Sequence, residues 1–179
     1  MCAFRAKRER NEFFYEKKEY KRSLAIKYAQ KWAYNRNPKY YNFDSLGGDC
    51  TNFISQCVYA GSKEMNYNKN NGWYYSNLNN RSASWSGVNE FYNFLVSNKL
   101  NGPRGDIVEQ KDLRVGDIIQ LSFNGTEFAH TLIIVDIENI EALDKIYTAS
   151  HTFDSYKRKV SSYNFQKIRF IHINGVYKF

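Results

Sequence analysis

Apolar side chains in residues 47–61 recur at the spacing of one helix face, at Cys50, Phe53, Ile54, Cys57 and Val58. Gly47 and Gly48 allow a tight turn just before them, and Asp49 is a typical N-cap residue whose carboxylate can bond first-turn N–H groups. Gly61 is a typical C-terminal stop. The pattern therefore predicts an amphipathic helix with Cys50 in its first turn.

Two further stretches have helical spacing. Residues 13–35 end before the Asn37-Pro38 pair and place apolar side chains on one face at Tyr20, Leu24, Ala25, Tyr28 and Trp32. The other helix is expected to begin after Ser86 as N-cap, to end before a Gly102-Pro103 turn, and to be apolar at Val88, Phe91, Tyr92, Leu95 and Val96. Between the second and third helices lies a long polar segment, residues 66–84. We expect Trp73 and Trp85 to be exposed there, as substrate walls or as loop anchors.

The second half of the chain has the period of strands. After a turn at residues 115–117, strands are predicted at residues 118–123, 128–137, 146–151 and 163–173, with a short one at 176–179. Asn124-Gly125 is a hairpin signal between the first two. Helices first and consecutive strands afterwards indicate an α+β fold in which N-terminal helices pack on an antiparallel sheet.

Length and composition fit one cored domain. The chain has 179 residues, of which 42% are hydrophobic and 17% aromatic, which excludes wholesale disorder. We predict a basic, frayed segment at residues 1–18 and a single domain at residues 19–179. No apolar run has membrane-spanning length and no signal peptide is visible, so the chain as written is expected to be cytoplasmic, or exported if a leader was removed.

The positive charge is concentrated near the N-terminus. Residues 1–40 hold 12 Lys or Arg and 4 Asp or Glu, whereas residues 41–179 hold 14 of each. Such a segment could contact an anionic polymer such as nucleic acid, a membrane surface or an acidic wall polymer. Glutamates interleaved with the basic residues favour the simpler interpretation, a solvated helix face.

Three cysteines are too few for a disulfide framework, and their spacing matches no metal site, so neither a metal nor a cofactor is expected. Cys57, on the apolar face, is interpreted as a core residue. Cys50 could be the same, but its place at a helix N-terminus favours the thiolate, and the first-turn N–H groups could hold an oxyanion.

A thiol nucleophile needs a base and a group that orients the base. His130 opens a predicted buried strand, and His151 ends the next strand, so an antiparallel pairing brings the two imidazoles to the same end of the sheet. We predict His130 as the base, oriented by a neutral His151 or, alternatively, by Asp154. The simpler alternative for His130 is a satisfied core histidine, and His172 is interpreted as structural.

These residues carry a resemblance. The run Gly-Gly-Asp-Cys-Thr-Asn-Phe-Ile-Ser-Gln-Cys at residues 47–57, with Tyr28-Ala-Gln-Lys-Trp32, Asn37-Pro38, Gly72-Trp73-Tyr74-Tyr75, Ser84-Trp85, and Ser150-His151-Thr152 with Asp154, resembles a bacterial amidase-domain family. That family is similar to the NlpC and CHAP groups of papain-like cysteine hydrolases. The match spans roughly residues 20–155.

The resemblance implies a papain-like fold and hydrolysis of an amide bond, often in bacterial cell-wall peptide. It also implies Cys50 as nucleophile, His130 as base and His151 as the orienting residue. Candidates for contact with the substrate or the oxyanion are Asp49, Tyr40, Tyr41, Trp73 and Trp85. Two alternatives remain: an acyltransferase that uses the same residues, and a binding module of the same fold without turnover.

Overall fold

The computed structural model describes residues 16–179. The predicted frayed segment therefore lies outside the described residues, except for residues 16–18. These three residues form β1 (Glu16–Lys18), which pairs antiparallel with the C-terminal strand β9 (Lys167–Lys178). They thus belong to the sheet.

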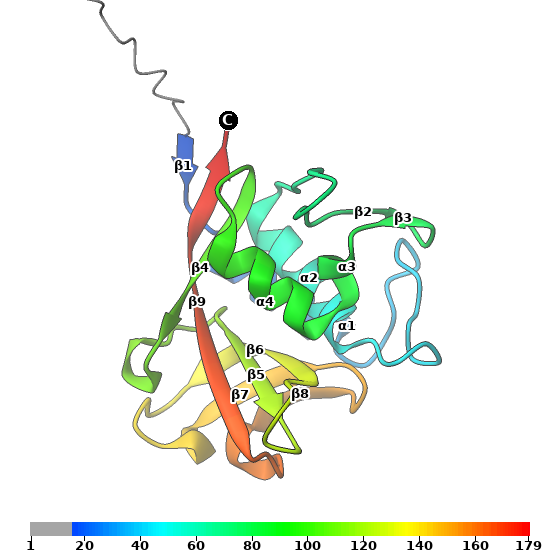
Figure 1. The fold of residues 1–179 in the computed structure, drawn as a ribbon. Coiled ribbons are helices and arrows are strands. Elements are labelled where there is room, and N and C mark those ends of the chain that lie inside the picture. Colours follow the sequence, from blue (N-terminus) through cyan, green and yellow to red (C-terminus); the bar gives the residue numbers. More distant parts are fainter. Residues whose placement is uncertain (1–15) are drawn as a thin grey trace, which may run out of the picture.

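The described residues form an α+β fold, as predicted (Figure 1). The helices are α1 (Arg22–Trp32), α2 (Cys50–Ser62), the single-turn α3 (Ala83–Ser86) and α4 (Val88–Ser97). The other strands of the main sheet are β4 (Gly102–Val108), β5 (Ile118–Ser122), β6 (His130–Ile137), β7 (Ile146–Ser150) and β8 (Ser155–Lys159). A small hairpin contains β2 (Tyr75–Asn77) and β3 (Asn80–Arg81), and short 3-10 turns are η1 (Gln110–Asp112), η2 (Leu143–Lys145) and η3 (Val160–Ser162).

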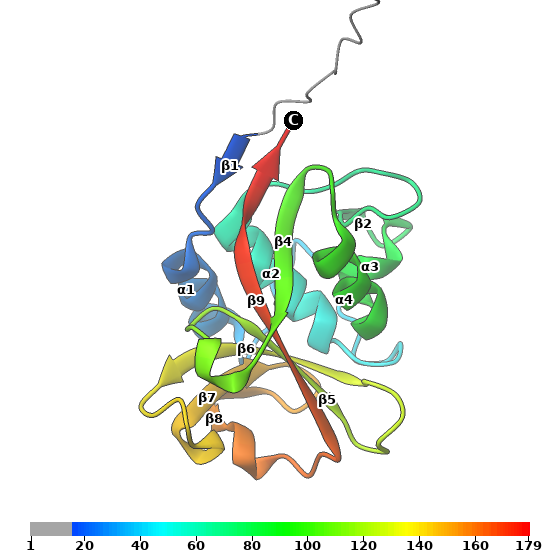
Figure 2. The ribbon, with the colours of Figure 1, turned by 60° about the vertical axis from the view of Figure 1, so that its left-hand side comes forward.

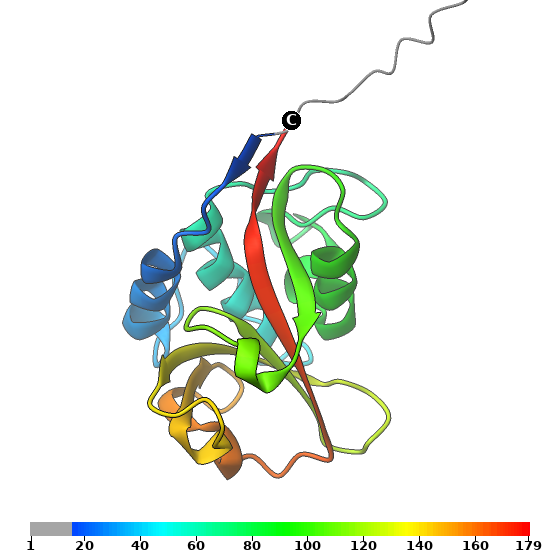
Figure 3. The same ribbon diagram turned by 90° about the vertical axis from the view of Figure 1, so that its left-hand side faces the viewer.

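All pairings in the main sheet are antiparallel. Its strand order is β1-β9-β5-β6-β7-β8, and β4 also pairs with β9. Figure 3 shows β9 between β1 and β4 in its C-terminal half. In Figure 2, α2 lies behind β4 and β9, with α1 on one side and α3 and α4 on the other. The strand β9 thus connects two parts of the sheet. Its C-terminal half pairs with β1 and β4, and its N-terminal half pairs with β5, which leads to β6, β7 and β8.

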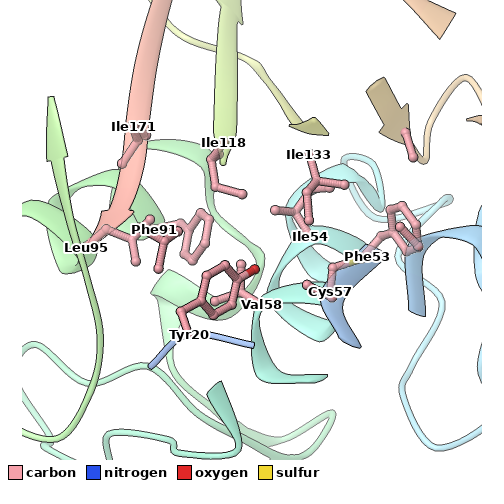
Figure 4. Packing of buried hydrophobic residues seen from close by; sticks show 14 of the residues in the cluster. Tyr20, Phe53, Ile54, Cys57, Val58, Phe91, Leu95, Ile118, Ile133 and Ile171 are labelled. Atoms are coloured by element: carbon pink, nitrogen blue, oxygen red, sulfur yellow. The ribbon is translucent and has the colours of Figure 1, made fainter. Parts of the chain in front are cut away.

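The sheet has an apolar core on each face. On the helix side, α2 is buried along its whole length except for Tyr59 and Ser62. Figure 4 shows its apolar residues against the sheet and α4, and this cluster includes Phe53, Ile54, Val58, Phe91, Leu95, Ile118, Ile133 and Ile171. The second core lies on the other face and includes Ile119, Leu121, Leu132, Ile134, Val160 and Tyr163. Because strand side chains alternate, β5 and β6 contribute to both cores.

Several predicted boundaries were wrong. The predicted helix at residues 13–35 is α1 from Arg22 only, preceded in the described residues by β1. Gly61 lies inside α2, and the left-handed residue that ends the helix is Lys63. Ser86 ends α3, so the N-cap of α4 is Gly87. The two strands predicted after residue 163 are one, β9.

The strand β1, the β2–β3 hairpin, β4 and β8 were not predicted, and for β4 and β8 the reason is that both are polar. The strand β4 contains Pro103 and charged residues, and it pairs only with β9, at an edge where a proline is tolerated. The strand β8 reads Ser-Tyr-Lys-Arg-Lys and is the other edge of the sheet. Edge strands are commonly charged, which hides them from a hydrophobicity pattern.

The expected exposure of the two tryptophans was also wrong. Trp73 and Trp85 are fully buried in the helix-side core, with ring centroids 5.0 Å apart. Their indole N–H groups donate to α2, from Trp73 to Ser55 Oγ at 3.0 Å and from Trp85 to Asn52 Oδ1 at 2.9 Å. Of the two predicted uses, anchoring the long loop is the one that the structure shows.

Replacing Gly61 with alanine is expected to destabilise the fold by about 1–3 kcal/mol, a typical cost of overpacking. A Cβ atom at this position would lie 2.4 Å from Tyr20 Cε2 and 3.0 Å from the Lys21 carbonyl oxygen, where the chain enters α1. Urea unfolding of the variant measures the change. Ala60→Gly in the same turn is the control for helix propensity, and an unchanged midpoint for Gly61→Ala would contradict the packing.

Candidate active site

Cys50 is the first residue of α2 and lies where the helix meets the sheet. Gly47 and Gly48 precede it with φ angles of 92° and 105°, so the predicted tight turn is present. Cys50 is 7% exposed, and its Sγ lies 3.8 Å from Thr51 Oγ1 and accepts a hydrogen bond from the backbone of Thr131 in β6. The sulfur thus contacts the strand at the residue that follows His130.

The environment of Cys50 favours the thiol over the thiolate. Burial raises the pKa of the Cys50 thiol above its ordinary value, and the hydrogen bonds from Thr131 and Thr51 only partly oppose this effect. The helix N-terminus was expected to favour the thiolate. The raised pKa is opposite to that expectation, and burial is its largest cause.

His130 is the first residue of β6 and is 3% exposed. Burial, together with the nearby cation of Arg158, lowers the pKa of His130 to about 4. Its Nε2 atom is buried, and among the residues that the structure describes neither ring nitrogen has a hydrogen-bond partner. The imidazole is therefore neutral, and both nitrogens are free of the fold's own hydrogen bonds.

The imidazole of His130 points to the sheet face opposite α2. Thr131 faces α2, since its Oγ1 lies 2.9 Å from Thr51 Oγ1, and the neighbouring side chain must then face the other way. His130 packs there against the rings of Phe123, Phe153 and Tyr163. The structure thus brings Cys50 and the start of β6 together, without a hydrogen bond between sulfur and imidazole.

His151 follows β7 and, as predicted from the antiparallel pairing, lies at the same end of the sheet as His130. Its Nδ1 lies 2.6 Å from Asp49 Oδ2 and its Nε2 lies 2.8 Å from the Trp32 carbonyl oxygen, while the ring stacks on Phe53 at 3.9 Å. Both partners are acceptors, so both nitrogens are satisfied when each carries hydrogen. The predicted hydrogen bond from His130 to a neutral His151 is therefore absent.

Asp154, the alternative orienting residue, is also engaged elsewhere. Its two carboxylate oxygens accept from Arg36 Nη1 and Nη2, both at 2.9 Å. Arg36 bonds Asp44 as well and lies 3.5 Å from Asp49 Oδ2. In this structure Asp154 therefore fixes the loop after β7 to the loop before α2.

Asp49 is the N-cap residue of α2 but does not cap the helix with its side chain. Its Oδ1 accepts from the Phe43 N–H at 2.9 Å and from Asn52 Nδ2 at 2.8 Å, and its Oδ2 binds His151. The carboxylate is fully buried, so these donors supply the interactions that water would otherwise give. The predicted N-cap hydrogen bond is replaced by a tie between α2, the preceding loop and His151.

The loop tyrosines differ from each other. Tyr40 stacks on Trp85, and burial raises the pKa of its hydroxyl to about 12. Tyr41 is 38% exposed, with its carbonyl held by Asn52 Nδ2 at 3.1 Å. Asn52 joins the Tyr41 loop, Asp49 and Trp85 but was not predicted as a site residue. Its polar side chain inside an apolar helix was the available signal.

Comparisons with known proteins identify the family to which the chain belongs. Residues 19–174 match the model of the family described as "Putative amidase domain", and the chain belongs to that family. The chain is 35% identical over 130 residues to YhbB and 26% identical over 147 residues to YjcM, both of Bacillus subtilis (strain 168). These matches cover 71% and 75% of the chain but only 40% and 31% of the two relatives. No solved structure matches the chain.

Within residues 16–179, no group of His, Cys, Asp or Glu side chains could hold a metal ion. No helix in the same range combines the length and the apolar composition needed to cross a membrane.

Alkylation of Cys50 by iodoacetamide at pH 7 is expected to be slower than that of a free thiol such as glutathione, because burial raises the pKa of Cys50. The rate should still be climbing at pH 9. Peptide mass spectrometry locates the label. Cys57, which is fully buried, should be labelled only on unfolding, and a Cys50 rate above that of glutathione at pH 7 would contradict this account.

Proposed function

We propose that this protein is a cysteine hydrolase of amide bonds with a papain-like arrangement, similar to the NlpC and CHAP groups. Cys50 is the nucleophile and His130 the general base. The observation that carries the proposal is the contact of Cys50 Sγ with the strand residue next to a buried, neutral histidine whose ring nitrogens have no partner among the described residues. Membership of the amidase-domain family supports it.

The raised pKa of Cys50 and the lowered pKa of His130 favour a neutral pair over a thiolate–imidazolium ion pair. The proton therefore leaves the sulfur as it attacks the carbonyl carbon, and the imidazole takes it up. For this step the imidazole must leave its packing against Phe123, Phe153 and Tyr163 and move to the sulfur, and the proposal requires this rearrangement. The protonated imidazole then gives its proton to the departing amine, and water hydrolyses the thioester.

The N-terminus of α2 is suited to hold the oxyanion. Because Asp49 binds Phe43, Asn52 and His151, its carboxylate makes no cap hydrogen bond to the first turn. The first-turn N–H groups therefore donate no hydrogen bond to the Asp49 carboxylate. Together with the positive end of the helix dipole, they lie at the helix end that carries the Cys50 sulfur. Such donors stabilise the charge that develops on a carbonyl oxygen.

Bacterial cell-wall peptide is the first substrate to test. Purified cell wall and a panel of peptides are incubated with the native protein and with Cys50→Ala, and products are identified by mass spectrometry. New termini formed only by the native protein support the proposal. Equal cleavage by both proteins, or cleavage by neither across the panel, would contradict it. An added amine that appears in the product would mark the alternative acyltransferase.

A further inference from the structure

An apolar cavity of about 350 Å³ lies beside His130, on the sheet face opposite α2. It is lined by Phe123, Phe153, Arg158, Tyr163 and Asn164. The three aromatic rings also flank the imidazole, with centroid distances to His130 of 6.1 Å, 6.5 Å and 5.8 Å respectively. The cavity and the proposed base therefore share a wall.

Two of the lining rings are exposed to an extent that folding does not explain. Phe123 is 40% exposed and Phe153 is 62% exposed. Phe153 follows Thr152, whose φ of 79° is an unfavourable left-handed conformation for a β-branched residue. Strained residues cluster in ligand-binding loops, and adjacent exposed aromatic rings commonly mark binding sites. The loop after His151 thus holds a phenylalanine at the edge of the cavity.

Arg158 supplies a fixed positive charge in the cavity wall. Its guanidinium donates to Ser162 Oγ at 2.9 Å and to the Ser162 carbonyl at 3.2 Å, and it lies 3.9 Å above the ring of Tyr163. Within residues 16–179, no carboxylate forms an ion pair with it. A guanidinium held in this way is prepared to bind a carboxylate.

We infer that this cavity binds an apolar acid, with the apolar side chain between the aromatic rings and the carboxylate on Arg158. The cavity lies on the sheet face opposite α2, so the inference does not require the bound group to be attached to Cys50. The ligand class is an N-acyl amino acid, or a peptide, whose C-terminal residue has a large apolar side chain.

Binding is tested in Cys50→Ala, so that turnover does not matter. The probes are both enantiomers of N-acetyl-phenylalanine, the matching amides, and N-acetylglycine, titrated while backbone amide chemical shifts are followed by NMR. At least one N-acetyl-phenylalanine enantiomer should shift Phe123, Phe153 and Tyr163 and bind about tenfold more tightly than its amide and than N-acetylglycine.

Two variants separate the contributions. Arg158→Gln should remove the preference for acid over amide, and Phe153→Ala should weaken both about equally. Lys159→Gln, which removes a charge from the same strand outside the cavity, should bind as the parent does. Shifts elsewhere, no binding, or an unchanged acid preference in Arg158→Gln would overturn the inference. Binding without any Cys50-dependent hydrolysis by the native protein would instead count against the proposed function alone.

Discussion

Replacing His130 with asparagine is expected to slow Cys50-dependent amide hydrolysis by about 10²- to 10⁴-fold, the usual contribution of a general base. The native rate should rise as the pH passes through about 4 and then level off, because His130 can accept a proton only when neutral and its pKa is lowered to about 4. The rate is measured from pH 3 to pH 9. His172→Asn is the matched control. In the native protein His172 binds Asp117, away from Cys50, so this variant should keep the native rate.

The same variant gives a readout that needs no substrate. The pKa of His130 is lowered from 6.5 to about 4 in the folded protein, so protonation favours unfolding. Its contribution to stability is complete above pH 6.5 and is lost as the pH falls toward 4, by up to about 3 kcal/mol. Comparing urea unfolding of the native protein and His130→Asn across this range isolates the effect. Parallel pH profiles for the two proteins would contradict a buried neutral imidazole.

Replacing Asp49 with alanine is expected to cost about 3–5 kcal/mol of unfolding free energy, because each buried donor that loses its acceptor costs about 1–3 kcal/mol. The change leaves three buried donors without their acceptor, namely the Phe43 N–H, the Asn52 amide and the His151 Nδ1–H. Urea unfolding at pH 7 measures the loss. The variant should also lose most hydrolytic activity, because Asp49 sets the start of the helix that carries Cys50.

Asp44→Ala is the matched control for this variant. Asp44 also binds Arg36, but its side chain is 42% exposed, so the loss should be below about 1 kcal/mol. A double-mutant cycle with His151→Ala should show a coupling of about 1–3 kcal/mol between Asp49 and His151. If Asp49→Ala were no more destabilising than Asp44→Ala, the tie between α2 and His151 would have little energetic importance.

The elements that could be predicted from the sequence are those in which every residue on one face, or on both faces, is buried and apolar. The helix from Cys50 and the strands β5, β6 and β7 were predicted because their apolar residues follow the period of the buried surface. The strands β4 and β8 were missed because each lies at an edge, where polar side chains face solvent. Trp73 and Trp85 lie in an asparagine-rich loop, and only tertiary packing determines that they are buried.

In the candidate site, topology was predictable and hydrogen-bond partners were not. The antiparallel pairing of β6 and β7 placed His130 and His151 at one end of the sheet, as the order of the strands required. Whether His151 binds His130, Asp49 or a carbonyl group depends on ångström-scale positions of the Trp32 and Phe43 segments, which carry no periodic pattern. The balance of burial against hydrogen bonding at Cys50 depends on the same positions, and it decides the charge of the sulfur.

The pairing of Glu16 with Lys178 places the first and last strands of the sheet side by side (Figure 3). A longer polypeptide that contains this fold can therefore enter and leave it at neighbouring positions. The matched segments make up only 40% and 31% of the two Bacillus relatives, which are thus longer than the segments that match. The fold can then be inserted into another protein, or flanked by other modules, without stretching the sheet or crossing the N-terminus of α2.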